Sequence, residues 1–263
     1  MLSYAPNVSW LFSELPFNER PAVAAKAGFT AIEFGFPSHA DLDALDEARK
    51  AYGLQIVLFN QDVPVWDEEN RGYLVDPKRR DEFRRKLDEA LEIARRLGVR
   101  KIMLPAGVVI SSLDRRAQRD CMIDNLLYAA ALAEDAAVLL TIEALNPQDN
   151  PGYFLTTSQE GFEIVKSVAH PHVRFQFDTY HIQMMEGGLE QKIRDEIGWI
   201  GHIQFADYPG RHEPGSGVID FKSVISAIQQ SGYQDCIGLE YIPLLQGSET
   251  LNWAFSQLRL PHI

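Results

Sequence analysis

The middle of the chain reads VLLTIEAL at residues 138–145, TSQEGFEIVKSV at 157–168 and VRFQFD at 173–178. The first and third segments are almost continuously apolar, which is typical of parallel strands covered on both faces. The segment between them begins with Thr157 or Ser158, residues that favour the N-cap of a helix. This order predicts a strand–helix–strand unit with a right-handed crossover.

The same alternation extends along the whole chain. Comparable apolar runs are AIEFGF (31–36), IVLFN (56–60), KIMLPA (101–106), HIQFAD (202–207) and CIGLEY (236–241), with a weaker run, NVSWLF, from residue 7. Helical patterns follow the runs, among them residues 42–52, 81–98, 220–232 and 249–258. Eight such pairs within 263 residues predict one (β/α)8 TIM barrel domain spanning residues 1–263. A doubly wound open sheet is the alternative, but no GxGxxG follows the first strand.

Composition narrows the class of protein. The chain carries 25 Lys and Arg against 37 Asp and Glu, a formal charge of −12, which argues against a nucleic-acid partner. Its two cysteines, Cys121 and Cys236, do not suffice for a disulfide scaffold or a zinc cluster. Neither a signal peptide nor a bilayer-spanning apolar stretch is evident, so we expect a cytoplasmic enzyme with no membrane partner. The oligomeric state stays open, with a homo-oligomer among the options.

Oxygen-bearing side chains occur where four successive predicted strands end. They are Glu143, Asp178, Gln204 and Glu240. In a TIM barrel these ends meet at the face that carries the chemistry. A carboxylate in an apolar strand is costly unless it is paired, hydrogen-bonded or bound to a metal, and a salt bridge remains the alternative for any single one. Three carboxylates and one amide suit Mg²⁺ or Mn²⁺.

Several motifs resemble the hydroxypyruvate isomerase family of the xylose-isomerase-like barrel superfamily. They are IEALN (142–146), PGYF (151–154), FDTYH (177–181), GHIQFADYPGRHEPGSG (201–217) and IGLEYIP (237–243). The resemblance implies a divalent metal held by Glu143, Asp178, Gln204 and Glu240. It also implies that Glu143 and Glu240 exchange protons with the substrate, with the direction left open. The implied reaction interconverts hydroxypyruvate and 2-hydroxy-3-oxopropanoate (tartronate semialdehyde) through an enediolate.

A small hydroxy or oxo acid substrate carries a carboxylate, so a cation should meet it. Arg211 and His212 are the leading candidates, followed by His181 and then by Arg71. An arginine offers a two-pronged fork that matches a carboxylate. The competing interpretation is that Arg211 pairs with Glu213.

Related enzymes provide the alternative functions. A 2-oxo-tetronate isomerase would use the same site residues on a four-carbon acid, and one sequence rarely reveals that difference. In ketose 3-epimerases a histidine usually stands where this chain has Gln204. A metal-dependent endonuclease of the superfamily would need histidines on several strands and a basic surface. A non-catalytic sugar-acid binding protein would not need two glutamates opposed across a metal.

Overall fold

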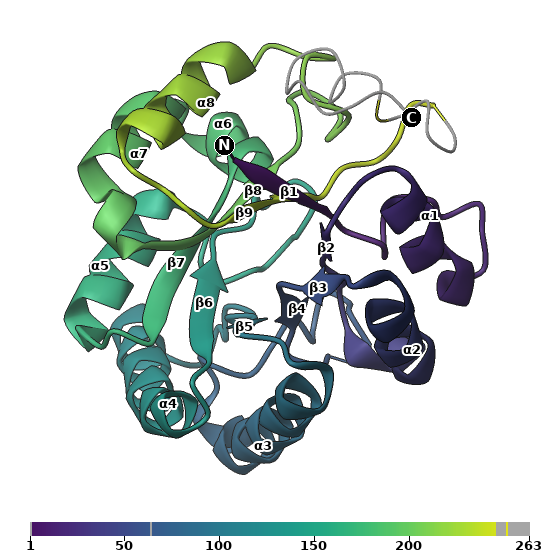
Figure 1. Ribbon diagram of the computed structural model, residues 1–263. Coiled ribbons are helices and arrows are strands. Elements are labelled where there is room, and N and C mark those ends of the chain that lie inside the picture. The colour runs from purple at the N-terminus through teal and green to yellow at the C-terminus, as the bar shows by residue number, and fades with distance from the viewer. Residues whose placement is uncertain (1, 64, 246–250, 252–263) are drawn as a thin grey trace.

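A computed structural model describes residues 2–63, 65–245 and 251 of the chain. Parallel strands lie at the centre and helices surround them (Figure 1). The strands are β1 (Ser3–Pro6), β2 (Ala31–Ile32), β3 (Gln55–Ile56), β4 (Phe59–Asn60), β5 (Lys101–Met103), β6 (Leu139–Glu143), β7 (Val173–Asp178), β8 (Ile200–Phe205) and β9 (Cys236–Leu239). The α-helices are α1 (Arg20–Lys26), α2 (Leu42–Tyr52), α3 (Arg80–Leu97), α4 (Arg115–Asp135), α5 (Ser158–Val168), α6 (Thr179–Met185), α7 (Leu189–Glu196) and α8 (Phe221–Gln230). Short 3-10 helices are η1 (Phe17–Glu19), η2 (Pro37–His39), η3 (Pro77–Arg79) and η4 (Ile197–Trp199).

The strands form a ring. Seven of them make a parallel sheet in the order β1-β9-β8-β7-β6-β5-β4, and β2 pairs with β3. The parallel bridge between Asn7 and Glu33 connects β1 to β2, while β3 and β4 are consecutive pieces of one short segment. The first and last strands of the described chain thus lie side by side, as a TIM barrel requires. The predicted fold class is confirmed.

Two strand predictions need correction. The weak run from Asn7 is not a strand: Trp10 N and Leu11 N bond to the carbonyl of Asn7, so the chain turns there. The first strand, β1, instead covers Ser3–Pro6. The single run predicted at residues 56–60 belongs to two strands, because β3 pairs with β2 whereas β4 pairs with β5.

Several helix ends lie at capping residues that the sequence provides. Asp41 accepts a hydrogen bond from Ala44 N at the start of α2, and Thr157 accepts one from Glu160 N at the start of α5. Gly98 ends α3 with a left-handed φ of 69°. The last predicted helix, residues 249–258, lies outside the described residues apart from residue 251.

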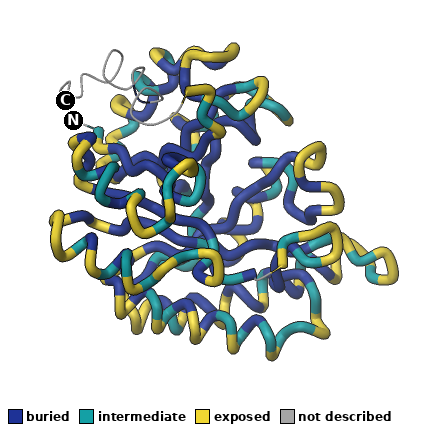
Figure 2. Tube along the Cα trace, turned by 90° about the vertical axis from the view of Figure 1, so that its right-hand side faces the viewer, coloured by how far each residue is buried: buried dark blue, intermediate teal, exposed yellow. Residues whose placement is uncertain are grey.

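Burial follows the layered arrangement. Figure 2 shows buried residues concentrated along the central strands and exposed residues on the outer helices and loops. Between the layers, the rings of Phe162 on α5 and Phe175 on β7 lie 4.6 Å apart. Gly161 makes this close packing feasible, since a Cβ there would lie 2.3 Å from Phe175 Cε2. Among the described helices, none has the length and apolarity to cross a bilayer.

Candidate active site

The predicted site residues gather at the carboxyl ends of the strands. Glu143 and Asp178 are the last residues of β6 and β7, and Glu240 directly follows β9. Gln204, on β8, is in register with Asp178. All four side chains are buried, with exposed fractions of 7% or less. The structure therefore places each of them where the barrel prediction requires.

Three of the titratable groups come close enough to surround one ion. Ligand atoms of Glu143, Asp178 and His181 lie within 4.8 Å of one another. Glu143 Oε1 and His181 Nε2 are buried without a hydrogen-bond partner among the described residues. Unsatisfied buried polar atoms are rare, so these two atoms indicate a place for a ligand.

The carboxyl groups raise one another's pKa. Burial, and then the charges of Asp178 and Glu240, raise the pKa of Glu143 well above its ordinary value. Burial also raises the pKa of Asp178 to about 7 and that of Glu240 to about 7, although the charge of Arg211 lowers both. A divalent cation would offset this repulsion, and carboxylate oxygens are the ligands that Mg²⁺ or Mn²⁺ prefers. The described residues fit such an ion.

Asn146 determines which ring nitrogen of His181 carries the proton. The backbone N–H of Asn146 donates to His181 Nδ1 at 3.2 Å, and its side-chain amide lies 2.8 Å from the same nitrogen. Burial, and then the charge of Arg211, lower the pKa of His181 well below its ordinary value, so the ring is neutral. Because Nδ1 accepts, the proton sits on Nε2. His181 therefore suits donation to a substrate oxygen better than metal ligation. Nothing in the local sequence distinguishes Asn146 from any turn residue, so this partner is visible only in the structure.

Arg211 lies among acids and aromatic rings. Its Nη2 is 2.8 Å from Glu240 Oε2 and 3.5 Å from Asp178 Oδ2. The guanidinium lies 4.7 Å from the ring centre of Trp10. The ion pairs of Arg211 among the described residues are with Glu240 and Asp178, and the alternative pairing with Glu213 is not formed. Arg211 has a left-handed φ of 57°, a strained conformation for a side-chain-bearing residue.

Asp207 holds the loop that carries Arg211 in place through hydrogen bonds. The buried carboxylate of Asp207 accepts four backbone N–H groups, two on each oxygen. The donors are Tyr208 at 2.8 Å and Ile219 at 3.0 Å on Oδ1, and Gly215 at 2.8 Å and Gly217 at 2.9 Å on Oδ2. His212 also helps to hold this loop in place, because its Nδ1 lies 2.8 Å from the carbonyl oxygen of Ile242. This contact places His212 in the loop framework.

The amide of Gln204 is oriented by a buried polar network. Its Nε2 donates to Glu33 Oε1 at 2.7 Å, and its Oε1 accepts from Gln176 Nε2 at 2.7 Å. Gln176 also donates to Glu143 Oε2 at 3.1 Å, and His202 Nε2 lies 2.8 Å from Glu33 Oε2. The oxygen of Gln204 therefore faces the side of the network that includes Glu143. Its predicted place among the metal ligands stays a prediction.

Known proteins that resemble this chain identify its family. Residues 21–255 match the family described as xylose isomerase-like TIM barrel. The chain belongs to this family. A 2-oxo-tetronate isomerase from Cupriavidus necator is 37% identical over 253 residues, covering 96% of this chain and 97% of the relative. The hydroxypyruvate isomerase of Escherichia coli is 34% identical over 253 residues, covering 96% of this chain and 98% of the relative.

A solved structure agrees with the fold. The crystal structure of a protein named AP endonuclease, family 2, from Brucella melitensis has a TM-score of 0.93 and 35% identity, covering 98% of this chain and 99% of that chain. The isomerase relatives, similar over their full length, support an isomerase of the xylose isomerase-like family.

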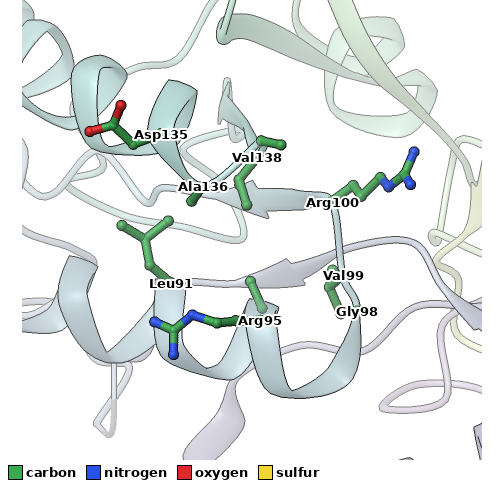
Figure 3. A pocket seen from close by; sticks show the side chains of 10 residues that line it. Leu91, Arg95, Gly98, Val99, Arg100, Asp135, Ala136 and Val138 are labelled. Atoms are coloured by element: carbon green, nitrogen blue, oxygen red, sulfur yellow. The ribbon is translucent and has the colours of Figure 1, made fainter.

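Arg71 is the remaining predicted site residue of this family member. It comes from the loop between β4 and α3, is 6% exposed and donates from Nη1 to Asn150 Oδ1 at 2.7 Å. Its guanidinium lies 5.6 Å from the ring centre of Trp66. A separate pocket of about 400 Å³ lies at the opposite, amino-terminal ends of β5 and β6 (Figure 3). It is lined by residues such as Arg95, Arg100 and Asp135, and by none of the candidate site residues.

Proposed function

We propose that this protein interconverts hydroxypyruvate and tartronate semialdehyde, using Glu143 and Glu240 to move a proton between adjacent carbons. The observation that supports this proposal is the pair of buried glutamates at one end of the barrel, each with a raised pKa. A carboxyl group with a pKa near neutrality, as Glu240 has, can both accept and donate a proton at physiological pH, and the pKa of Glu143 is shifted in the same direction.

The reaction needs one proton removed and one delivered. In hydroxypyruvate, C3 carries the hydroxyl and C2 is the ketone. One glutamate, as carboxylate, takes a proton from C3, and the electrons of that C–H bond form the enediolate. The other glutamate, as acid, delivers a proton to C2, while the proton of the C3 hydroxyl is transferred to the C2 oxygen, so that C3 becomes the aldehyde and C2 carries the hydroxyl. Which glutamate acts first stays open.

Other residues would stabilise the charge that develops on oxygen. The Nε2–H of His181 is positioned to donate to an enediolate oxygen, because it has no partner among the described residues. Arg211 adds a positive charge beside Asp178 and Glu240. Glu143 and Asp178 would hold a divalent cation, with Gln204 and Glu240 completing the predicted set. When bound, that cation supplies Lewis-acid polarisation of the substrate oxygens.

The four-carbon alternative is 2-oxo-tetronate isomerisation. Relatives with both names match the chain at similar identity, 37% and 35% for two 2-oxo-tetronate isomerases and 34% for a hydroxypyruvate isomerase. The substrates differ by one hydroxymethylene group, which a pocket discriminates by about 1–3 kcal/mol. We favour the three-carbon acid on the motif resemblance and treat the four-carbon acid as the second candidate.

An endonuclease function receives less support, although one solved relative carries that name. A trinuclear zinc site would need several histidines, whereas the acidic cluster among the described residues includes only His181. The formal charge of −12 also disfavours a DNA-facing surface.

A coupled assay tests the proposal. The protein is stripped of metal, reloaded with Mg²⁺ or Mn²⁺, and given hydroxypyruvate or a four-carbon 2-oxo acid, with the product followed by a coupling reductase. We expect Glu143→Gln and Glu240→Gln each to lower kcat by about 10²–10⁴-fold. Glu47→Gln, an exposed change on α2, serves as the control and keeps full activity. Activity that survives both active-site changes would refute the assigned roles.

A further inference from the structure

Arg71 is a buried positive charge that no carboxylate pairs at salt-bridge distance within the described part of the chain. It is 6% exposed, and its recorded contacts are the hydrogen bond to Asn150 Oδ1 and the ring of Trp66. The acids that act on it, Glu68 and Asp67, are exposed and make no salt bridge with it. Its Nε is buried and has no hydrogen-bond partner among the residues that the structure describes. A buried charge without a counterion is costly in free energy, so binding of an anion beside Arg71 would stabilise this site.

The backbone holds Arg71 against the mouth of the barrel. The next residue, Gly72, bridges to Ala106 just beyond β5. Gly72 has a φ of 118°, and a Cβ there would lie 2.2 Å from the carbonyl oxygen of Pro105. Only glycine allows this approach. Arg71 is thereby fixed on the same end of the barrel as the acidic cluster.

One hydrogen-bonded path and one shared electrostatic neighbour relate Arg71 to the acidic cluster. Its partner Asn150 bonds through its backbone N–H to the carbonyl of Asn146, the residue that fixes His181. The charges of Arg71 and Glu143 both act on Tyr153, whose hydroxyl accepts from Ala106 N at 2.8 Å. Arg71 therefore borders the site that contains Glu143 and His181.

The two arginines of the site have different surroundings. Arg211 comes from the loop after β8 and is already paired with Glu240 and Asp178. Arg71 comes from the loop after β4, which in the strand order lies across the ring from β8. The charge left for an incoming anion is therefore that of Arg71.

We propose that Arg71, held by Asn150, binds the carboxylate of the substrate, so that Arg71 selects 2-oxo acids over neutral ketoses. This assignment rests on the proposed isomerase function, because it concerns the same site. Guanidinium matches a carboxylate with two parallel hydrogen bonds, and the partnerless Nε is one of the donors available for them. Arg211 then pairs with Glu240 and Asp178 and does not bind the substrate carboxylate.

Binding of tartronate, a stable three-carbon dicarboxylate, tests the assignment by calorimetry on the metal-loaded protein. We expect Arg71→Met to weaken tartronate binding by about 10²–10³-fold. Arg71→Lys should recover part of this loss, since it keeps the charge without the fork. Arg85→Met is the control: Arg85 is exposed on α3 and pairs with Glu89, and its loss should leave tartronate affinity within about twofold.

Chemical rescue separates binding from loop structure. In Arg71→Ala, added guanidinium ion should restore most of the lost tartronate affinity, which a purely structural role would not allow. Equal tartronate affinity in wild type and Arg71→Met, or no binding by wild type, would overturn the assignment. Failure of the proposed function gives a different result: wild type would bind tartronate through Arg71 yet turn over neither three- nor four-carbon 2-oxo acids.

Discussion

Asp207→Asn should release the loop that carries Arg211. The carboxylate of Asp207 accepts two backbone N–H groups on each oxygen. Asparagine has one oxygen, so in either amide orientation two of the four N–H groups face an NH₂ group and lose their acceptor. A hydrogen bond to a charged group contributes about 1.5–3 kcal/mol. The expected loss of local stability is therefore about 3–6 kcal/mol.

Amide hydrogen exchange measures this loss where it occurs. The opening free energy at Gly215, Gly217 and Ile219 should fall by that amount in Asp207→Asn, and urea unfolding should show whether the loop opens alone or with the barrel. The kcat of the isomerase reaction should fall together with loop stability, because Arg211 loses its fixed position. A loss below about 1 kcal/mol at all three amides would refute the reasoning.

Asp220→Asn is the matched control. Asp220 lies just after the same loop and caps α8 by accepting from Ser223 N at 3.2 Å. Asparagine caps helices as well as aspartate does, so the same chemical change should leave stability nearly unaltered.

Three further changes test other parts of the account. Gly161→Ala should lower the free energy of unfolding in urea by about 1–3 kcal/mol, because the added Cβ would lie 2.3 Å from Phe175. Gly198→Ala, where the added Cβ has no described atom within 4 Å, should not, and equal effects of the two changes would contradict the packing argument. His181→Gln should lower kcat by about 10²–10³-fold with unchanged Mn²⁺ affinity, and a tenfold loss of affinity would show that His181 is a ligand. In EDTA, Asp178 and Glu240 should lower Tm as pH rises from about 4, near their unfolded pKa values, to their folded-state pKa values of about 7, because the folded state binds their protons more tightly in that range. Glu33, whose pKa burial also raises to about 7, acts in the same direction. His181 and His202 act in the opposite direction up to and around pH 6.5, because their lowered pKa values leave them unprotonated in the folded state while the unfolded chain still binds those protons; the test therefore compares pH profiles with and without the ion. Saturating Mg²⁺ should remove the part of the fall that comes from Asp178 and Glu240, and identical pH profiles with and without the ion would contradict the metal assignment.

Local sequence patterns predicted the barrel because its elements depend on near neighbours. The apolar runs at residues 138–145 and 173–178 became β6 and β7, and Gly98 ended α3 as its position indicated. The split of residues 55–60 into β3 and β4 was not predictable, since it depends on two different partner strands.

The positions of the candidate site residues were predictable from the sequence, whereas their contacts were less so. Strand ends identified Glu143, Asp178 and Glu240, because buried carboxylates stand out in apolar runs. The hydrogen-bond partners of the site residues come from distant parts of the chain. Gln204, for example, donates to Glu33, which is 171 positions away. Local sequence also cannot indicate that Arg211 pairs with Glu240, or that no carboxylate in the described part of the chain forms a salt bridge with Arg71. Those facts depend on how loops cross the barrel mouth.

Proton exchange at the substrate carbon tests the central claim most directly. Hydroxypyruvate in D₂O is incubated with the metal-loaded protein and followed by proton NMR, with buffer and metal alone as the blank. We predict loss of the C3 proton signal and appearance of the tartronate semialdehyde aldehyde signal with wild type, and neither with Glu143→Gln or Glu240→Gln. Wild type that leaves the C3 protons in place, or conversion that persists in both variants, would contradict proton transfer by these two glutamates.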